Sequence, residues 1–132
     1  LRVDSRVLPA CNFPAPEVAS VGLTEAQAVE RGHQVRCGRF PFAANGRAHA
    51  LGETEGMVKI VADARTDEIL GMHIMGPEAG ELIAVGALAM SMEGTVEDIA
   101  RTIHTHPTLA EAILEAAEDY YGHGIHTRPR KH

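Results

Sequence analysis

Two neighbouring segments show the alternation of apolar and polar residues that is typical of half-buried strands. In residues 56–63, every second position on one face is apolar, and a strand places such positions on the same side of a sheet. These positions are Val58, Ile60 and Ala62. Residues 68–76 form a second run, separated from the first by the polar residues 64–67. The pattern predicts an antiparallel β-hairpin.

Two further strands are expected before this hairpin. Residues 17–22 form a short β-prone run that ends in glycine, and residues 34–42 alternate weakly before they reach Pro41. Short runs of this kind, bounded by glycine or proline, are typical of strands. The chain therefore supplies four predicted strands in all.

A short helix and a turn are expected beside these strands. Thr24 is a good N-cap and Gly32 a good stop, which predicts a helix over residues 25–31. Residues 45–48 read Asn-Gly-Arg-Ala, and this composition is typical of a turn.

The second half of the chain is predicted to be helical. Residues 78–92 form a helix that is apolar on most sides. Its apolar residues are Leu82, Ile83, Val85, Leu88, Ala89 and Met92. A helix of this kind is buried against a sheet or a partner subunit. We therefore expect the isolated chain either to form a dimer that covers this helix or to be prone to aggregation.

Two more helices follow. Gly94 and Thr95 interrupt the pattern, and Thr95 is a suitable cap for a helix over residues 96–103. The last helix is expected over residues 108–121, where Gly122 ends it.

The order of these elements predicts the fold class. One strand, one helix, three strands and then helices indicate an α+β fold, an antiparallel sheet with helices packed on one face. A length of 132 residues suits a single domain over residues 1–132, with a C-terminal tail over residues 122–132. Because the first residue is Leu1 and not Met, we expect the chain to be a piece of a longer protein.

Composition removes several classes of function. The net charge of −6 argues against nucleic acid, whose phosphates require a basic surface. The sequence contains no apolar run as long as a membrane span and opens with no signal peptide, so we expect a cytoplasmic protein. Cys11 and Cys37 form no C-x-x-C pair and are expected to be structural thiols.

Candidate chemistry gathers in residues 102–111, which read T-I-H-T-H-P-T-L-A-E. His106 precedes Pro107, which restricts the backbone of His106 to extended conformations. A histidine can take and return protons near neutral pH. Glu111 lies five residues later and can orient the ring and stabilise its protonated form. These residues suggest half of an active site.

Simpler interpretations of both residues remain open. His106 is also compatible with a polar position in a loop. Residues Thr108 to Glu111 form the capping-box pattern T-x-x-E, which explains the glutamate without any catalysis. The two uses compete for one carboxylate.

Metal and phosphate sites are not predicted. His104 and His106 form an H-x-H pair, but two ligands are too few for zinc, and no nearby cysteine or Asp-rich loop completes the set. The histidines of the tail, His123, His126 and His132, could in principle supply further ligands. The glycines between residues 71 and 76 precede no G-K-[ST] pattern, and the chain has no G-x-G-x-x-G fingerprint.

Four motifs carry a resemblance to a known family. They are Pro16-Glu17-Val18-Ala19-Ser20-Val21-Gly22-Leu23-Thr24-Glu25, Phe42-Ala43-Ala44-Asn45-Gly46-Arg47-Ala48, Gly76-Pro77-Glu78-Ala79-Gly80-Glu81-Leu82-Ile83 and His104-Thr105-His106-Pro107-Thr108-Leu109-Ala110-Glu111. In this order they resemble the C-terminal interface (dimerisation) domain of the pyridine nucleotide-disulfide oxidoreductases. The second and fourth motifs look most like the dihydrolipoamide dehydrogenases (E3) of 2-oxo acid dehydrogenase complexes.

The resemblance implies roles for individual residues. His106 would be the acid–base histidine that one subunit offers to the FAD and redox disulfide of its partner, and Glu111 would orient it. The His106–Pro107 peptide bond would be cis, and both residues would lie near the partner subunit's FAD. The substrate would be dihydrolipoamide, oxidised with NAD+.

The resemblance also implies partners and missing parts. FAD and NAD would belong to the parent enzyme, with none bound by this fragment alone, and residues 1–15 would be a linker from the absent FAD and NAD domains. We expect a homodimer and no metal. As an alternative, the chain is an interaction module without its own catalysis, which dimerises and binds the subunit-binding domain of the acyltransferase (E2).

Overall fold

The predicted hairpin lies at the centre of the sheet. The computed structural model describes residues 4–123. Strand β4 (Met57–Asp63) pairs antiparallel with β5 (Ile69–Met75), and the three apolar positions expected on one face of β4 are fully buried. The alternation along the sequence therefore identified both the strands and the face that meets the core.

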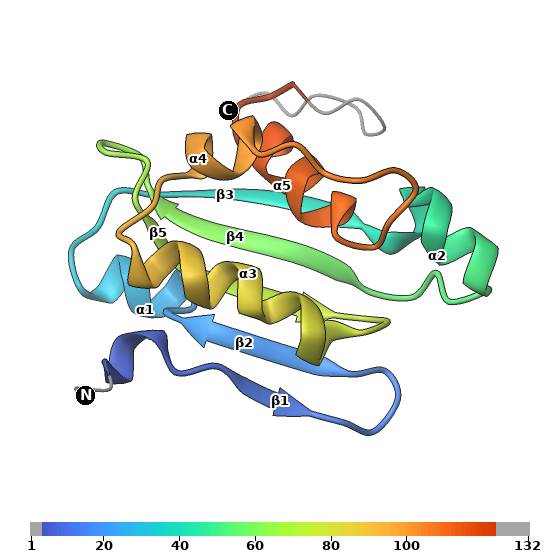
Figure 1. The fold of residues 1–132 in the computed structure, drawn as a ribbon. Helices are drawn as coiled ribbons and strands as arrows, with labels where there is room; N and C mark the ends of the chain where they lie inside the picture. Colours follow the sequence, from blue (N-terminus) through green and yellow to red (C-terminus); the bar gives the residue numbers. More distant parts are fainter. Residues whose placement is uncertain (1–3, 124–132) are drawn as a thin grey trace.

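Three more strands complete a five-stranded antiparallel sheet in the order β1-β2-β5-β4-β3 (Figure 1). Strand β3 (Val35–Pro41) pairs with β4, and β2 (Val18–Gly22) pairs with β5. Strand β1 (Ala10–Asn12) lies at the edge beside β2. It falls within residues 1–15, which we expected to be a linker, and its three residues are part of the sheet instead.

Three helices cover one face of this sheet. Helix α3 (Ala79–Ser91) packs on β2 and β5, and α5 (Glu111–Tyr120) packs on β3 and β4. Helix α4 (Val96–Arg101) packs on α5, and Figure 1 shows all three in front of the sheet. The expected α+β class with an antiparallel sheet is confirmed.

A smaller apolar cluster lies on the other face. Helix α1 (Glu25–Glu30) places Ala28 against Val61 and Leu70. Val61 follows Ile60, which belongs to the main core, so neighbouring residues of β4 point to opposite faces. The sheet is therefore partly covered on both sides.

Residues 45–48 begin a helix and do not form the expected turn. A short 3₁₀ helix, η2 (Phe42–Ala44), leads into α2 (Gly46–Leu51). Asn45 is the N-cap of α2, and its Oδ1 accepts a hydrogen bond from the amide of Ala48 at 2.9 Å. Asparagine is favoured both in turns and at N-caps, so composition alone did not separate the two.

The last two helices are shorter than expected. Helix α4 ends at Arg101, and α5 begins at Glu111. Gly122 follows the end of α5 with a φ of 77°, as a C-terminal stop requires. The remaining tail lies outside the described residues, and His126 and His132 lie there too. Between residues 4 and 123, no helix combines the length and apolar character needed to cross a membrane.

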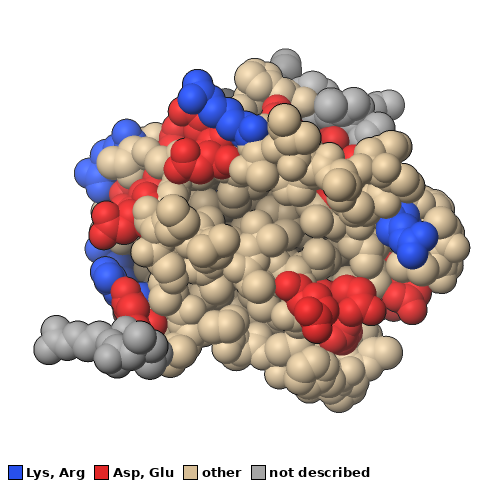
Figure 2. Space-filling view, in the orientation of Figure 1, with Lys and Arg blue, Asp and Glu red and all other residues tan. Residues whose placement is uncertain are grey.

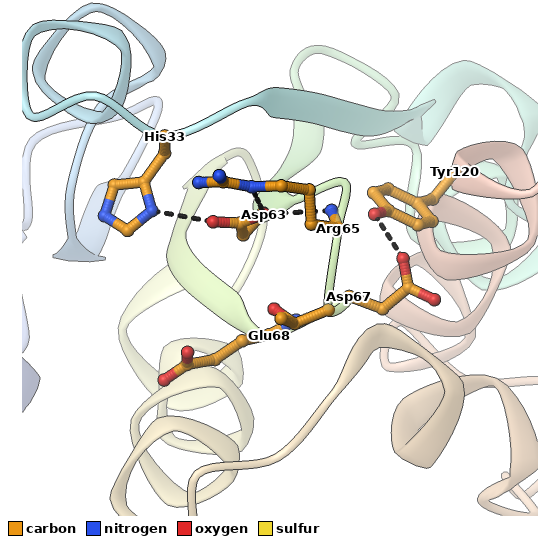
Figure 3. Close-up of polar contacts among 7 residues, drawn as sticks. His33, Asp63, Arg65, Asp67, Glu68 and Tyr120 are labelled. Carbon is orange, nitrogen blue, oxygen red and sulfur yellow. Dashed lines mark hydrogen bonds and ion pairs between the residues drawn. The ribbon is translucent and has the colours of Figure 1, made fainter.

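Polar contacts fix the turn between β4 and β5 (Figure 3). The carboxylate of Asp63 pairs with the ring of His33 at 2.9 Å and accepts the amide N–H of Arg65 at 2.9 Å. These two contacts, that of His33 foremost, lower the pKa of Asp63 to about 2. The hydroxyl of Tyr120 donates to Asp67 at 2.7 Å, which ties the end of α5 to this turn.

Candidate functional site

His106 and Glu111 form a hydrogen-bonded pair where α5 begins. Nδ1 of His106 lies 3.0 Å from each carboxylate oxygen of Glu111. Because a carboxylate only accepts hydrogen bonds, Nδ1 carries the hydrogen and Nε2 is the acceptor of the neutral ring. The side chain of His106 is 79% exposed and that of Glu111 22%. The pair therefore presents Nε2 to the surroundings.

Glu111 also binds the backbone of the same loop. Its Oε1 accepts the amide N–H of Thr108 at 2.8 Å, so the expected competition for the carboxylate is wrong: one group makes both contacts. The threonine half of the capping box is absent, since the hydroxyl of Thr108 donates to the carbonyl of Thr105 at 2.8 Å and α5 has no side-chain cap.

The charge of the carboxylate is stabilised at this position. Burial of Glu111 acts to raise its pKa, but the hydrogen bonds from His106 and Thr108 outweigh it, with smaller contributions from the charges of His106 and His104. The net effect is a pKa below the ordinary value of a glutamate. Glu111 is thus a carboxylate that can stabilise a protonated imidazole next to it.

The loop that carries the pair stands out from the surface. Ile103 is 97% exposed, and Thr105, His106 and Pro107 are exposed as well. The His106–Pro107 peptide bond is cis, as the resemblance implies. Leu109 is the buried residue of the loop, so the loop meets the core just before α5 begins.

Asn45 also belongs to this site, although the sequence did not identify it as a site residue. Nδ2 of Asn45 donates to the carbonyl oxygen of Thr108 at 3.0 Å, which joins the second and fourth motifs. Asn45 is buried. It was assigned to a turn, and nothing in its own surroundings in the sequence indicates a contact 63 positions away.

The other histidine of the H-x-H pair has a local role. Nδ1 of His104 donates to the carbonyl oxygen of Thr102 at 2.9 Å. Among the described residues, no three His, Cys, Asp or Glu side chains converge as metal ligands.

Neither cysteine is activated. Cys11 and Cys37 are free thiols, and burial is the main cause that raises the pKa of each. A raised pKa lowers the fraction of thiolate, which is the nucleophilic form. Thiol chemistry at this site must come from groups outside these two residues.

A family comparison decides where the chain belongs. Residues 8–117 match the family model of the pyridine nucleotide-disulphide oxidoreductase dimerisation domain. The chain belongs to this family. The matched residues include His106, Glu111 and Asn45, so this dimerisation domain contains the whole candidate site.

Similar proteins of known name support the assignment. The dimerisation domain is 51% identical over 127 residues to a dihydrolipoyl dehydrogenase of Haloferax volcanii and 52% identical over 124 residues to the mitochondrial enzyme of Pisum sativum. These alignments cover 96% and 94% of the chain and 27% and 25% of the relatives.

A solved structure shows the same fold. The crystal structure of LpdA from Mycobacterium tuberculosis matches with a TM-score of 0.82 and 31% identity, over 88% of this chain and 25% of that one. The chain therefore spans about a quarter of the length of the proteins it matches.

Proposed function

We propose that this chain is the dimerisation domain of a dihydrolipoamide dehydrogenase, with His106 and Glu111 as its acid–base pair. The observation that carries the proposal is the outward-facing Nε2 atom of His106, held by the contact of Glu111 with Nδ1. The identity of 51% to a dihydrolipoyl dehydrogenase supports the choice of enzyme.

The proposed chemistry is a proton transfer followed by thiol–disulfide exchange. Nε2 of His106 takes the proton of a dihydrolipoamide thiol, and Glu111 stabilises the imidazolium that forms. The thiolate then attacks a redox disulfide of the partner subunit, which forms a mixed disulfide with one of its sulfurs and releases the other as a thiolate. An ordinary thiol has a pKa of about 8.5 and is mostly protonated at neutral pH, so a base at this point raises the concentration of the reactive form.

The site is proposed to form across a homodimer. Val85 and Leu88 are exposed on α3, and so is Met92, which follows the last residue of this helix. The exposed fraction is 63% for Leu88 and 74% for Met92. Figure 2 shows an uncharged area across the centre of the face where α3 lies in Figure 1. An exposed apolar patch that is rimmed by charged residues is typical of an interface.

FAD and NAD are assigned to parts of the enzyme outside this chain. The described glycines between β4 and α3 serve close packing: a side chain at Gly71 would meet the carbonyl oxygen of Leu23, and one at Gly76 would meet the ring of Phe42. These residues do not form a phosphate-binding loop. We therefore expect the isolated chain to be inactive, with His106 and Pro107 reaching the FAD of the partner.

A complementation experiment tests the shared site. One variant of the full-length protein carries His106→Gln and the other lacks the redox disulfide, so each is inactive alone. Random exchange makes half of the dimers mixed, each with one intact site of two, and about a quarter of the wild-type activity should return. No recovery in verified mixed dimers would mean that His106 does not serve the partner's site.

Charge favours E2 as a second partner. The chain carries a net charge of −6, and a surface groove is lined by Phe13, Glu17, Glu53, Glu55 and Glu78 among others. Figure 2 shows acidic side chains gathered in patches on the visible face. A basic subunit-binding domain would be complementary in sign. Binding should weaken steeply with salt, and no binding at low salt would remove this partner.

A further inference from the structure

We propose that Asn45 is a positioning residue for the His106–Glu111 pair, an inference that rests on the proposed function of that pair. Asn45 is only 5% exposed. Its Nδ2 donates to the carbonyl oxygen of Thr108 at 3.0 Å, while its Oδ1 accepts the amide of Ala48 at 2.9 Å. The same side chain caps α2 and holds the catalytic loop.

The contact is transmitted through one residue. Thr108 uses both of its backbone groups: its carbonyl accepts from Asn45, and its amide donates to Oε1 of Glu111 at 2.8 Å. These groups flank one Cα atom, so a fixed carbonyl restricts the direction of the amide. Glu111 in turn contacts Nδ1 of His106 at 3.0 Å. Three consecutive hydrogen bonds thus connect Asn45 to the imidazole.

The loop needs an anchor of this kind. Its residues before Thr108 are largely exposed, with Ile103 at 97%. Its other polar contacts are local, such as the one from the hydroxyl of Thr108 to the carbonyl of Thr105. The bond from Asn45 spans 63 positions and ties the loop to a buried side chain at the start of α2, the helix whose Ala48 belongs to the main core. Local contacts shape the loop, whereas this bond sets its orientation on the domain.

The two roles of Asn45 can be separated by one substitution. Asparagine and aspartate are about equally good N-caps, so Asn45→Asp keeps the bond to the amide of Ala48. It replaces the Nδ2 donor by an oxygen that faces the carbonyl oxygen of Thr108. Two acceptors cannot share a hydrogen, and the carbonyl is released. Asn45→Ser is a second variant that keeps a capping oxygen and lacks the donor.

The readout is the neutral tautomer of His106, measured in this chain by long-range ¹H–¹⁵N NMR correlation of the imidazole at alkaline pH. The wild type should be mainly Nδ1–H, because that nitrogen donates to Glu111. In Asn45→Asp and Asn45→Ser the Nδ1–H form should fall below half. Thr24→Ala is the matched control, since it removes the N-cap of another six-residue helix and should leave the tautomer unchanged.

Several results would overturn the proposal. They are an unchanged tautomer in the folded Asn45 variants, or the same loss in Thr24→Ala. If neither Asn45 variant folds, the wild-type chain provides the test. It must show a scalar coupling between Nδ2 of Asn45 and the carbonyl carbon of Thr108, across the hydrogen bond that joins them. Absence of this coupling counts equally against the proposal. None of these measurements needs catalysis, so a failure here is distinct from a failure of the proposed function.

In the full-length enzyme the same variants give a kinetic signature. Loss of positioning should lower kcat about tenfold, because small displacements of a catalytic group slow the reaction. KM for dihydrolipoamide should change less than about twofold, since the side chain of Asn45 is buried and offers little surface to a substrate. A rise in KM with an unchanged kcat would contradict a positioning role.

Discussion

Both carboxylate oxygens of Glu111 lie 3.0 Å from Nδ1 of His106. The two residues are five positions apart, and a loop with a cis His106–Pro107 bond brings them together. Since Glu111 opens α5, the imidazole is held relative to a helix that packs on the sheet. The orientation of an exposed side chain is therefore determined by the core of the domain.

Removing the charge of Glu111 should slow the enzyme without unfolding it. In Glu111→Gln the side chain keeps an oxygen for the amide of Thr108 but no longer stabilises a protonated imidazole. A hydrogen bond to a charged group contributes about 1.5–3 kcal/mol, so kcat for dihydrolipoamide oxidation should fall about 10- to 100-fold. Glu118→Gln, on the same helix, makes the same change in charge and should keep normal activity. Equal effects of the two substitutions would show that the position of Glu111 has no special role.

The hydroxyl of Tyr120 should contribute more to stability than that of Tyr121. Tyr120 is fully buried and donates to Asp67 at 2.7 Å, whereas the half-buried Tyr121 donates at 3.3 Å. Tyr120→Phe leaves one oxygen of Asp67 without this partner and should lower the free energy of unfolding by about 1–3 kcal/mol. Tyr121→Phe should cost less than about 1 kcal/mol. Urea unfolding of both variants checks the order, and the reverse order would contradict it.

The stability of the domain should fall between pH 4 and pH 2 in part through Asp63. The pKa of this group falls from the ordinary 3.8 to about 2 in the folded state. A lowered pKa stabilises the fold above the unfolded value, and that contribution is lost as the pH falls through the folded value. The difference in free energy of unfolding between wild type and Asp63→Asn should therefore shrink from about pH 4 to about pH 2. A difference that stays constant over this range would contradict the lowered pKa.

The exposed side of α3 should mediate dimerisation. Leu88 is 63% exposed on α3, and a leucine that becomes buried contributes about 2 kcal/mol. Leu88→Asp also places a charge in the interface, so the dissociation constant should rise more than tenfold. Val29→Asp on α1, at 58% exposure, is the control and should leave the dimer intact. Analytical ultracentrifugation at micromolar concentration measures the oligomeric state of the wild-type domain. A monomeric wild-type domain would refute the interface.

The regular parts of the fold could be predicted because each carries its own local signal. The alternation in β4 and the capping threonines Thr24 and Thr95 identify their elements directly, and both capping boxes are present. Strand β1 is only three residues long, which is too short for a recognisable alternation of apolar and polar residues. Its structure comes from its pairing with β2.

Only the part of the site that is close together in the sequence could be predicted. His106 and Glu111 lie close in the sequence, so their contact follows from loop geometry, and motif resemblance singled them out. The bond from Asn45 to Thr108 depends on tertiary packing, which composition does not reveal. The early end of α4 at Arg101 and the late start of α5 have a similar cause, since the intervening backbone follows the loop around His106.

The most direct test is the rate of dihydrolipoamide-dependent NAD+ reduction by the full-length protein that contains this chain, with His106→Gln compared with His104→Gln. The two histidines are two residues apart, but only His106 contacts Glu111. Loss of a general base should lower kcat at least about 100-fold in His106→Gln, with His104→Gln within a few-fold of wild type. A His106→Gln enzyme that keeps nearly full activity would show that this histidine is not the base.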